Sequence, residues 1–417
     1  MKTIYQHVPY IIIMAKNISA RCTLCIVAAI CLMGMGSCIE EFNAELPTSD
    51  VNLLVVEGTI LSDSVSTFYL TKTLPLSGSA TTDDSGTTID YSSASYSSAY
   101  SINNATIKLV GTDGIAVDGK RTEDGTYTID TPVLSANAQY SLQITYNGDT
   151  YETDPQTPFP SVPVESVVAD QPSPTSVLNV LVTTEAPADP KEIQYYRWTY
   201  IETWEVRPEV YSYCQWDSEE GKPVDLETPY PQRGWKSAQS QDIIASSSAY
   251  YGNNKIDSYK LYSIDRADRR LYVLYSTEVC QRSLSKAEYE YENERAKIAT
   301  EMGGLFTPQP SSLPTNIHCT TSSKRAVGYV GCSLNTCRYR LFVNPDNYKI
   351  DRQSTCSTIS SMDEGFEGED KMVTQGFVLC AYDDTPGMPM STSWTRPACV
   401  DVRLLGCFTD MPAYWPK

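Results

Sequence analysis

His318 and Cys319 place an imidazole and a thiol next to each other in the chain, and nucleophilic catalysis uses these groups as base and nucleophile. Neighbouring side chains in a strand point to opposite faces, so the two groups are not expected to act together. The sequence also contains no G-x-S-x-G elbow and no H-E-x-x-H pair. We therefore expect a protein that is not an enzyme.

The acidic residues offer a second kind of chemistry. The chain has 51 Asp and Glu against 32 Lys and Arg, a net charge of −19. Two opposed carboxyl groups are sufficient for glycoside hydrolysis, so a carboxylate-dependent glycan hydrolase stays open as a minor alternative. The same negative charge repels phosphate backbones, and we expect no nucleic-acid partner.

The cysteines divide into a leader group and a later group. Cys22, Cys25 and Cys31 lie in an apolar N-terminal stretch, so their spacing carries no information about metal binding. Beyond Cys38 the chain has the following nine cysteines, which we interpret as disulfide candidates: Cys214, Cys280, Cys319, Cys332, Cys337, Cys356, Cys380, Cys399 and Cys407. An odd number leaves at least one unpaired within the chain. Zinc binding by Cys319, Cys332 and Cys337 is the weaker interpretation, because paired C-x-x-C units are missing. We expect no metal and no cofactor.

Residues 1–37 have the form of a secretory leader, with Lys16 and Arg21 before a short apolar run. Met14 is an alternative start. The run is shorter than the roughly 20 residues that span a bilayer. It ends in Gly36, Ser37 and Cys38, which resemble the lipobox of bacterial lipoproteins. This resemblance implies cleavage before Cys38, lipidation of its thiol, and a linker over residues 38–50.

Glu40 and Glu41 follow the cysteine directly. An acidic cluster at this place resembles the signal by which Bacteroidota send lipoproteins to the outer face of the outer membrane. A solvated acidic linker is the alternative interpretation. We expect a lipid-anchored protein of the outer membrane, at the cell surface or, alternatively, on the periplasmic face.

The composition favours short strands joined by turns, with 25 Pro, 22 Gly and 29 Tyr, and we predict a mainly β fold. Strands punctuated by D-G and N-G turns predict an immunoglobulin-like β-sandwich over residues 51–154, interrupted by a mobile loop over residues 77–101. Prolines in residues 155–163 predict a stiff linker. Residues 164–417 are expected to form a larger β-rich domain with one helix.

Residues 193–206 form a long predicted strand with two different faces. Tyr196, Trp198, Tyr200 and Trp204 share one face, while Arg197 and its alternate neighbours share the other. Such a row of rings can stack on sugars. Packing against a second sheet is the favoured interpretation, because aromatic burial is favourable by itself. The possible ligand-contact aromatics are Trp198, Tyr200, Trp204 and, in the loop that follows, Trp216.

The predicted helix covers residues 285–302. Ser285 and Glu288 have the spacing of a capping box, and Gly303 with Gly304 ends the helix. The apolar stripe expected to pack on the β domain consists of Ala287, Tyr291, Ile298 and Met302.

Several segments in order resemble an outer-membrane lipoprotein family of Bacteroidota, the domain of unknown function 4249. Cys38, the acidic pair and Phe42 open the resemblance. The further segments are LLVVEG at 53–58, GGLF at 303–306, PTNI at 314–317, VGY at 327–329, CVD at 399–401, Gly406 and PAYW at 412–415. Val402 stands where the family pattern has a second cysteine, and Cys407 follows later.

The resemblance implies association with a TonB-dependent outer-membrane transporter and a role in nutrient capture; it brings no catalytic residues. We accordingly expect a binding lipoprotein that works with such a transporter. A structural or interaction lipoprotein of the cell envelope is the alternative.

Overall fold

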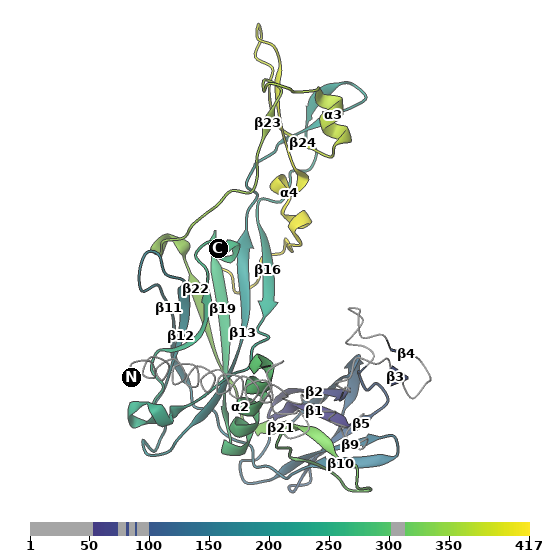
Figure 1. Ribbon diagram of the computed structural model, residues 1–417, viewed down its shortest axis with the longest axis vertical. Coiled ribbons are helices and arrows are strands. Elements are labelled where there is room, and N and C mark those ends of the chain that lie inside the picture. Colours follow the sequence, from purple (N-terminus) through teal and green to yellow (C-terminus); the bar gives the residue numbers. More distant parts are fainter. Residues whose placement is uncertain (1–52, 74–80, 83–87, 90–99, 302–312) are drawn as a thin grey trace, which may run out of the picture. The chain divides into compact units, whose positions relative to one another are not determined.

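The computed structural model shows a mainly β protein, as predicted (Figure 1). It describes residues 53–73, 81–82, 88–89, 100–301 and 313–417. These residues all belong to one compact unit, Asp50–Lys417. Among them, no helix has the length and apolar character needed to cross a bilayer.

Several predictions fall on residues outside these ranges. They concern the leader, Cys38, Glu40, Glu41 and most of the loop over residues 77–101. Within that loop two short strands are described, β3 (Thr81–Thr82) and β4 (Thr88–Ile89), and they pair with each other.

The N-terminal sandwich consists of two five-stranded sheets, and the β-sandwich predicted at this end of the chain is confirmed. One sheet has the order β21 (Ala326–Ser333), β1 (Leu54–Leu61), β2 (Ser64–Lys72), β8 (Thr126–Thr131), β7 (Lys120–Glu123). The other has the order β20 (Ile317–Cys319), β10 (Asp149–Thr153), β9 (Tyr140–Tyr146), β5 (Thr106–Gly111), β6 (Ala116–Asp118). Val56 and Ile60 of β1 are fully buried in the core shared by the two sheets, so Glu57 and Thr59 between them face outward.

Two strands of this sandwich come from far along the chain, which differs from the expected boundaries. β21 pairs in parallel with β1, in register from Leu54 opposite Ala326 to Leu61 opposite Ser333. β20 pairs antiparallel with β10. Parallel neighbours need a long crossover, and here the connection from β1 to β21 contains the other strands of the N-terminal sandwich, all strands of the central sandwich except β22 (Cys337–Val343), and helix α2 (Lys286–Glu301). The domain boundary predicted from the prolines does not include β20 and β21, which come from later in the chain.

The proline-rich segment over residues 155–163 is fastened to the same strand. The Phe159 amide donates to the Cys332 carbonyl at 2.9 Å, and the Leu334 amide donates back to the Phe159 carbonyl at 3.0 Å. The Ser161 hydroxyl donates to the Asn335 carbonyl at 2.7 Å. The segment therefore lies along the end of β21 and its outgoing turn, held by hydrogen bonds.

Gly328 allows β21 to approach β1. Its φ is +114°, and a Cβ at this position would lie 2.0 Å from the Val56 carbonyl oxygen. Only glycine accepts both this backbone conformation and this contact without strain.

The central sandwich packs a three-stranded sheet on a larger one. The smaller sheet has the order β11 (Val164–Asp170), β12 (Leu178–Thr184), β18 (Tyr259–Ile264). The larger has the order β16 (Gly234–Gln239), β13 (Tyr195–Val206), β19 (Tyr275–Leu284), β22 (Cys337–Val343), and β17 (Ile244–Ser247) also pairs with β13. Val180 and Val182 share a core with Tyr196, Trp198 and Val279. The aromatic face of β13 is thus the face between the two sheets.

Helix α2 (Lys286–Glu301) follows β19 directly and confirms the predicted helix position. The Ser285 hydroxyl accepts from the Glu288 amide at 3.2 Å, which is one half of the predicted capping box. The expected return bond from the Glu288 side chain is replaced by an ion pair with Arg282. Of the predicted apolar stripe, Tyr291 is buried as expected, but Ala287 is exposed, and Glu288 and Glu292 are buried beside Tyr291. Met302 lies outside the described residues.

A smaller disulfide subdomain joins two distant stretches of chain. It contains β14 (Cys214–Asp217), β15 (Lys222–Asp225), β23 (Ile359–Ser360), α3 (Glu369–Thr374), β24 (Val378–Asp383) and β25 (Ser391–Thr395). Cys214, Met372, Leu379 and Trp394 form its core. The Cys356–Cys399 disulfide closes it, linking Cys356 to a residue of α4 (Pro397–Val400) across 43 residues in sequence.

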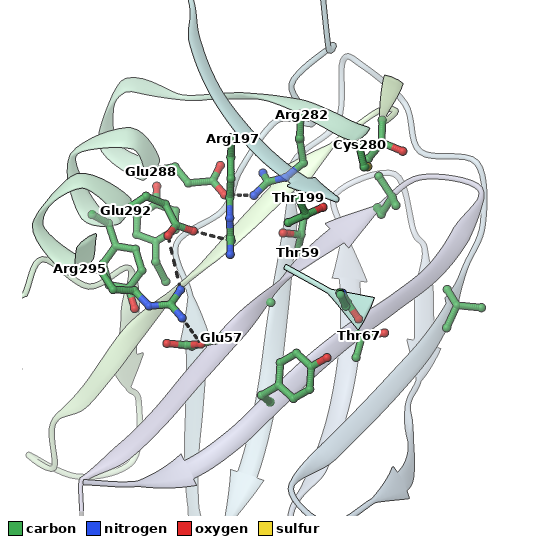
Figure 2. A pocket seen from close by; sticks show the side chains of 18 residues that line it. Glu57, Thr59, Thr67, Arg197, Thr199, Cys280, Arg282, Glu288, Glu292 and Arg295 are labelled. Carbon is green, nitrogen blue, oxygen red and sulfur yellow. Dashed lines mark hydrogen bonds and ion pairs between the residues drawn. The ribbon is translucent and has the colours of Figure 1, made fainter. Parts of the chain in front are cut away.

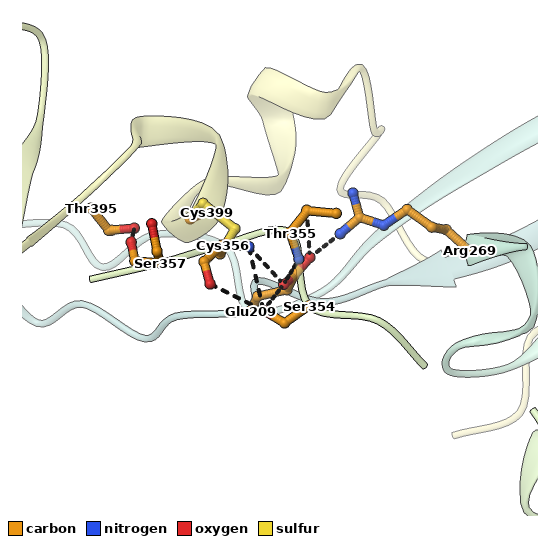
Figure 3. The surroundings of a disulfide bond; sticks show 8 residues. All are labelled: Glu209, Arg269, Ser354, Thr355, Cys356, Ser357, Thr395 and Cys399. Atoms are coloured by element: carbon orange, nitrogen blue, oxygen red, sulfur yellow. Dashed lines mark hydrogen bonds and ion pairs between the residues drawn. A yellow bond between two sulfur atoms is a disulfide. The ribbon is translucent and has the colours of Figure 1, made fainter. Parts of the chain in front are cut away.

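Glu209 anchors the segment at residues 354–356 that leads into the disulfide (Figure 3). Its carboxylate accepts from the Ser354 hydroxyl at 2.7 Å and from the backbone amides of Thr355 and Cys356 at 2.9 and 3.2 Å, and it pairs with Arg269. Burial alone would raise the pKa of Glu209, but these hydrogen bonds outweigh it and lower the pKa. The Glu209 carboxylate is therefore ionised and holds the segment at residues 354–356 in place.

The C-terminal tail packs on the central sandwich through Glu205, which is 2 % exposed. Arg207 and Arg233 each donate to its carboxylate at 2.8 to 2.9 Å, and the Trp415 indole N–H donates at 3.2 Å. Burial would raise the pKa of Glu205, but these donors lower it below its ordinary value of 4.5.

Replacing Gly328 tests the close approach of β21 to β1. Gly328→Ala is expected to lower the free energy of unfolding by on the order of 3 kcal/mol, because it combines backbone strain with a clash against Val56. Gly252→Ala is the matched control, since a Cβ at Gly252 meets open space, and it should change stability by less than about 0.5 kcal/mol. Equal urea midpoints for the two variants would contradict this account of the β1–β21 ladder.

Replacing Glu205 tests the tail contact through its dependence on pH. Because the folded pKa is lowered, the stabilisation is complete above the ordinary glutamate pKa and is lost as the pH falls through the folded value. Glu205→Gln should cost about 2 kcal/mol at pH 7, and the difference from wild type should shrink at pH 3. Melting curves at both pH values measure it, with the exposed Glu227→Gln as control. A difference that does not change with pH would rule out the ionised carboxylate as the cause.

Candidate functional site

A pocket of about 390 Å³ lies where the N-terminal sandwich, the central sandwich and α2 meet (Figure 2). The outward faces of β1 and β2 supply one wall, with Glu57, Thr59 and Thr67. The face of β13 and β19 opposite the aromatic core supplies another wall. The alternation of strand side chains therefore brings two polar faces toward one another, and α2 closes the pocket with its buried polar side.

Two arginines stand opposite each other on the wall formed by β13 and β19. Arg197 and Arg282 are direct partners in the antiparallel register, and Thr199 and Cys280 are the next such pair on the same face. Like charges directly opposite in a sheet destabilise it unless anions compensate them. The pocket needs carboxylates at this point.

Helix α2 supplies those carboxylates. Glu288 pairs with Arg282 at 2.7 Å, and Glu292 pairs with Arg197 at 2.6 Å. Residues four apart lie on one helix face, so both glutamates reach the sheet together. The four side chains form two parallel ion pairs, with both glutamates and Arg282 at least nine-tenths buried.

Arg295 extends the network to the other wall. It lies 3.5 Å from Glu292 and 2.9 Å from Glu57 of β1 (Figure 2). The chain of charges therefore runs from the central sandwich through α2 to the N-terminal sandwich. We call this set, with the cavity it lines, the arginine–glutamate pocket: Glu57, Arg197, Arg282, Glu288, Glu292 and Arg295.

Gly331 of β21 leaves room for the deepest pair. A Cβ at Gly331 would lie 2.2 Å from the Glu288 carboxylate and 2.9 Å from the Arg282 guanidinium. The absence of a side chain thus creates the space in which this ion pair forms.

Both arginines keep one buried N–H group without an acceptor among the described residues. These groups are Nε of Arg197 and Nη1 of Arg282. Burial lowers the pKa of Arg197; at Arg282 burial acts in the same direction, but Glu288 outweighs it and raises the pKa. Leaving a buried donor unsatisfied costs about 1–3 kcal/mol, more for a charged group. An acceptor atom brought by a bound molecule recovers that cost.

The chemistry of this pocket suits binding. Each of its three carboxylates already accepts from an arginine, so the groups that remain available are guanidinium N–H donors and hydroxyls. Thr59, Thr67 and Thr199 line the cavity with hydroxyl groups, and Gln239 adds an amide.

The structure places the four predicted ligand-contact aromatics elsewhere. Trp198 is 0 % exposed, and its indole N–H donates to Gln281 at 2.7 Å. Tyr200 stacks on Tyr262 with ring centroids 4.0 Å apart. These two rings belong to the core between two sheets, which corrects their assignment as ligand contacts.

The remaining two rings are also engaged in packing. Trp204 packs, partly buried, against a second core cluster of the central sandwich. Trp216 lies 6.0 Å from Trp394, between ring centroids, in the disulfide subdomain. Neither ring lines the arginine–glutamate pocket.

One disulfide forms among the predicted candidates, Cys356–Cys399. The other seven are free thiols: Cys214, Cys280, Cys319, Cys332, Cys337, Cys380 and Cys407. Of the nine candidates, the structure thus joins Cys356 and Cys399. Burial raises the pKa of Cys214 to about 11 and that of Cys332 to about 12, so these two act as small apolar side chains.

His318 and Cys319 have separate partners. The His318 ring lies 3.1 Å from Asp154 and is largely exposed, whereas the Cys319 thiol contacts the hydroxyls of Thr321 and Ser322. Within the described part of the chain, no three His, Cys, Asp or Glu side chains are grouped so as to hold a metal ion.

The pocket residues were missed because they are charged. Glu288, Tyr291, Glu292 and Arg295 have the spacing i, i+3, i+4, i+7 of one helix face, but apolar residues alone do not reveal this face. Arg197 lies on the predicted face of its strand, opposite the aromatic row. The charged stripe on α2 is the signal in the sequence that points to the pocket.

The comparison with protein families gives one match over most of the chain. A family model described as "Domain of unknown function (DUF4249)" matches residues 39–338. No curated protein matches the chain. The matched range begins directly after Cys38 and contains every residue that lines the pocket, whereas the tail segments at 399–415 lie beyond it.

The Arg282–Glu288 pair can be tested by removing one partner and then both. Arg282→Met leaves the Glu288 carboxylate buried without its cation and should lower the free energy of unfolding by about 3–5 kcal/mol. The double variant with Glu288→Met should recover most of this loss, because two apolar side chains need no partner. Urea unfolding followed by tryptophan fluorescence measures both.

Arg338→Met is the matched control, since Arg338 is 60 % exposed in its pair with Glu278 and should change stability by less than about 0.5 kcal/mol. If Arg282→Met were as stable as this control, the ion pair would not be what holds α2 on the sheet.

Proposed function

Since the chain belongs to the DUF4249 family, we propose that it is a lipid-anchored binding protein of the bacterial outer membrane that captures a small polar ligand in the arginine–glutamate pocket. The observation that carries this proposal is the pair of buried guanidinium N–H groups without an acceptor, one on Arg197 and one on Arg282. The packing of the two sandwiches does not by itself explain why these two N–H groups lack an acceptor. A bound ligand with acceptor atoms accepts a hydrogen bond from each of them.

The anchor in this proposal is Cys38. The family match starts at residue 39, so the matched region begins where cleavage before a lipidated cysteine would place the mature protein. Several acyl chains on one residue give stable attachment, at about 0.8 kcal/mol for each buried methylene. Glu40 and Glu41 then direct the protein to the cell surface.

The partner in this proposal is a TonB-dependent transporter. A lipoprotein of this kind holds its ligand at the membrane surface and passes it to the transporter for nutrient uptake. The alternative is a structural lipoprotein of the envelope, in which the ion network only joins α2 to the two sandwiches. The alternatives differ in whether the pocket binds a ligand and in which protein accompanies the chain.

Removal of the anchor tests the proposal in native membranes. Full-length wild type should incorporate a clickable palmitate analogue and sediment with outer membranes, whereas Cys38→Ser should lose the label. Cys31→Ser, within the leader, is the control and should keep it. Cross-linking the wild type in these membranes should then recover a TonB-dependent transporter.

Equal labelling of wild type and Cys38→Ser would refute the anchor. Recovery of other envelope proteins in place of a transporter would favour the structural alternative.

A further inference from the structure

We propose that the arginine–glutamate pocket recognises its ligand through a single carboxylate group held between Arg197 and Arg282. This inference rests on the proposed function, because it names the chemistry of the ligand captured at the same site. It follows from the geometry of the two arginines, the charge around them and the lining of the cavity.

The two arginines offer a matched pair of donors. They are direct cross-strand partners, so their side chains leave the sheet side by side on the same face. Each already uses Nη atoms on a helix glutamate and keeps one buried N–H unfilled, Nε on Arg197 and Nη1 on Arg282. A carboxylate has two oxygens in one plane and accepts such donors in pairs. One carboxylate therefore supplies an acceptor to each arginine.

Arg282 is the stronger indication of a ligand. The Arg282 side chain is 10 % exposed, so water reaches it poorly, and its Nη1 group has no acceptor among the described residues. Hydrogen bonds that involve a charged group are stronger than those between neutral groups. A ligand oxygen at this place accepts a hydrogen bond from Nη1 and removes the cost of the unsatisfied donor.

The local charge favours one negative charge over two. The pocket holds three arginines and three glutamates, so its formal charge is zero before a ligand enters. Glu288 and Glu292 lie beside the two donors, and a phosphate dianion would meet stronger repulsion from them than a carboxylate. The site is thus suited to a ligand group that carries a single negative charge.

The remaining lining suits a small, hydroxylated or amide-bearing body. Thr59, Thr67 and Thr199 present hydroxyls and Gln239 an amide, around a cavity of about 390 Å³. This is the lower part of the size range of small-molecule sites. A sugar acid and an amino acid both carry one carboxylate on a body of this size. The shared chemistry is the carboxylate, and the experiment separates the two sources.

Calorimetric titration of the full-length protein in detergent micelles tests the proposal with four probes. The probes are D-galacturonate, L-glutamine, D-galactose as the neutral match of the first, and D-galactose 6-phosphate as a dianion. At least one carboxylate should bind about 10- to 100-fold more tightly than galactose and more tightly than the phosphate ester. Galacturonate binding alone identifies a sugar acid, and glutamine binding alone identifies an amino acid.

Two variants ask whether the named arginines hold the carboxylate. Arg197→Lys keeps the cation beside Glu292 but loses the forked N–H groups, and should weaken carboxylate binding about tenfold. The double variant Arg282→Gln with Glu288→Gln removes both charges together, so no buried charge is left unpaired, and should weaken it at least as much. Arg338→Gln, outside the pocket, should bind as the wild type does. Melting curves confirm that each variant is folded.

The outcomes separate this inference from the proposed function. Galactose binding as tightly as the better of the two carboxylates, or tightest binding of the phosphate ester, overturns carboxylate recognition and leaves ligand capture in this pocket intact. Carboxylate binding unchanged in both folded variants overturns the role of Arg197 and Arg282. Binding of none of the four probes overturns the carboxylate inference, while recovery of the transporter in the cross-linking experiment still supports the proposed function.

Discussion

The repulsion between Arg197 and Arg282 is the constraint on which the arrangement around the pocket depends. The register of β13 and β19 places these two cations directly opposite each other. Two anions must face them, and the chain supplies both from the first turns of the helix that follows β19. The position of α2 is thus determined by charge, and its buried side is correspondingly polar. Because α2 packs on a polar sheet face through ion pairs, the cavity beside it is lined by guanidinium N–H donors.

The parallel ladder of β1 and β21 supplies the second half of this geometry. It returns the chain to the N-terminal sandwich after α2 and before β22, the last strand of the central sandwich, and so brings the outward face of β1 toward the helix. Glu57 then reaches Arg295, and Gly331 makes room for Glu288. The pocket is therefore formed jointly by segments from residue 57 to residue 336, and it requires both sandwiches. Such a site at a junction of two modules is a common location for small-molecule binding.

Local sequence patterns predicted the elements well and their partners poorly. The alternation in β9 and β13 was read correctly, since Leu142, Ile144 and Trp198 are all buried as expected. The helix position also followed from Ser285 as its N-cap. The buried face of that helix did not follow from the local sequence, because a polar side chain can be buried when its partner comes from another element. Arg282 and Glu288 became recognisable as a buried pair only once their strand and helix were placed together.

The sequence by itself determined that this chain is mainly β, that a helix follows residue 285, and that the chain resembles the family whose model matches residues 39–338. These features depend on residues close together in the chain. The tertiary structure alone decided that β21 completes the first sandwich, that Trp198 is core, and that six charged residues meet around a cavity. Strand pairing between residues 54–61 and 326–333 sets these positions, and pairing over such a distance leaves no local signal.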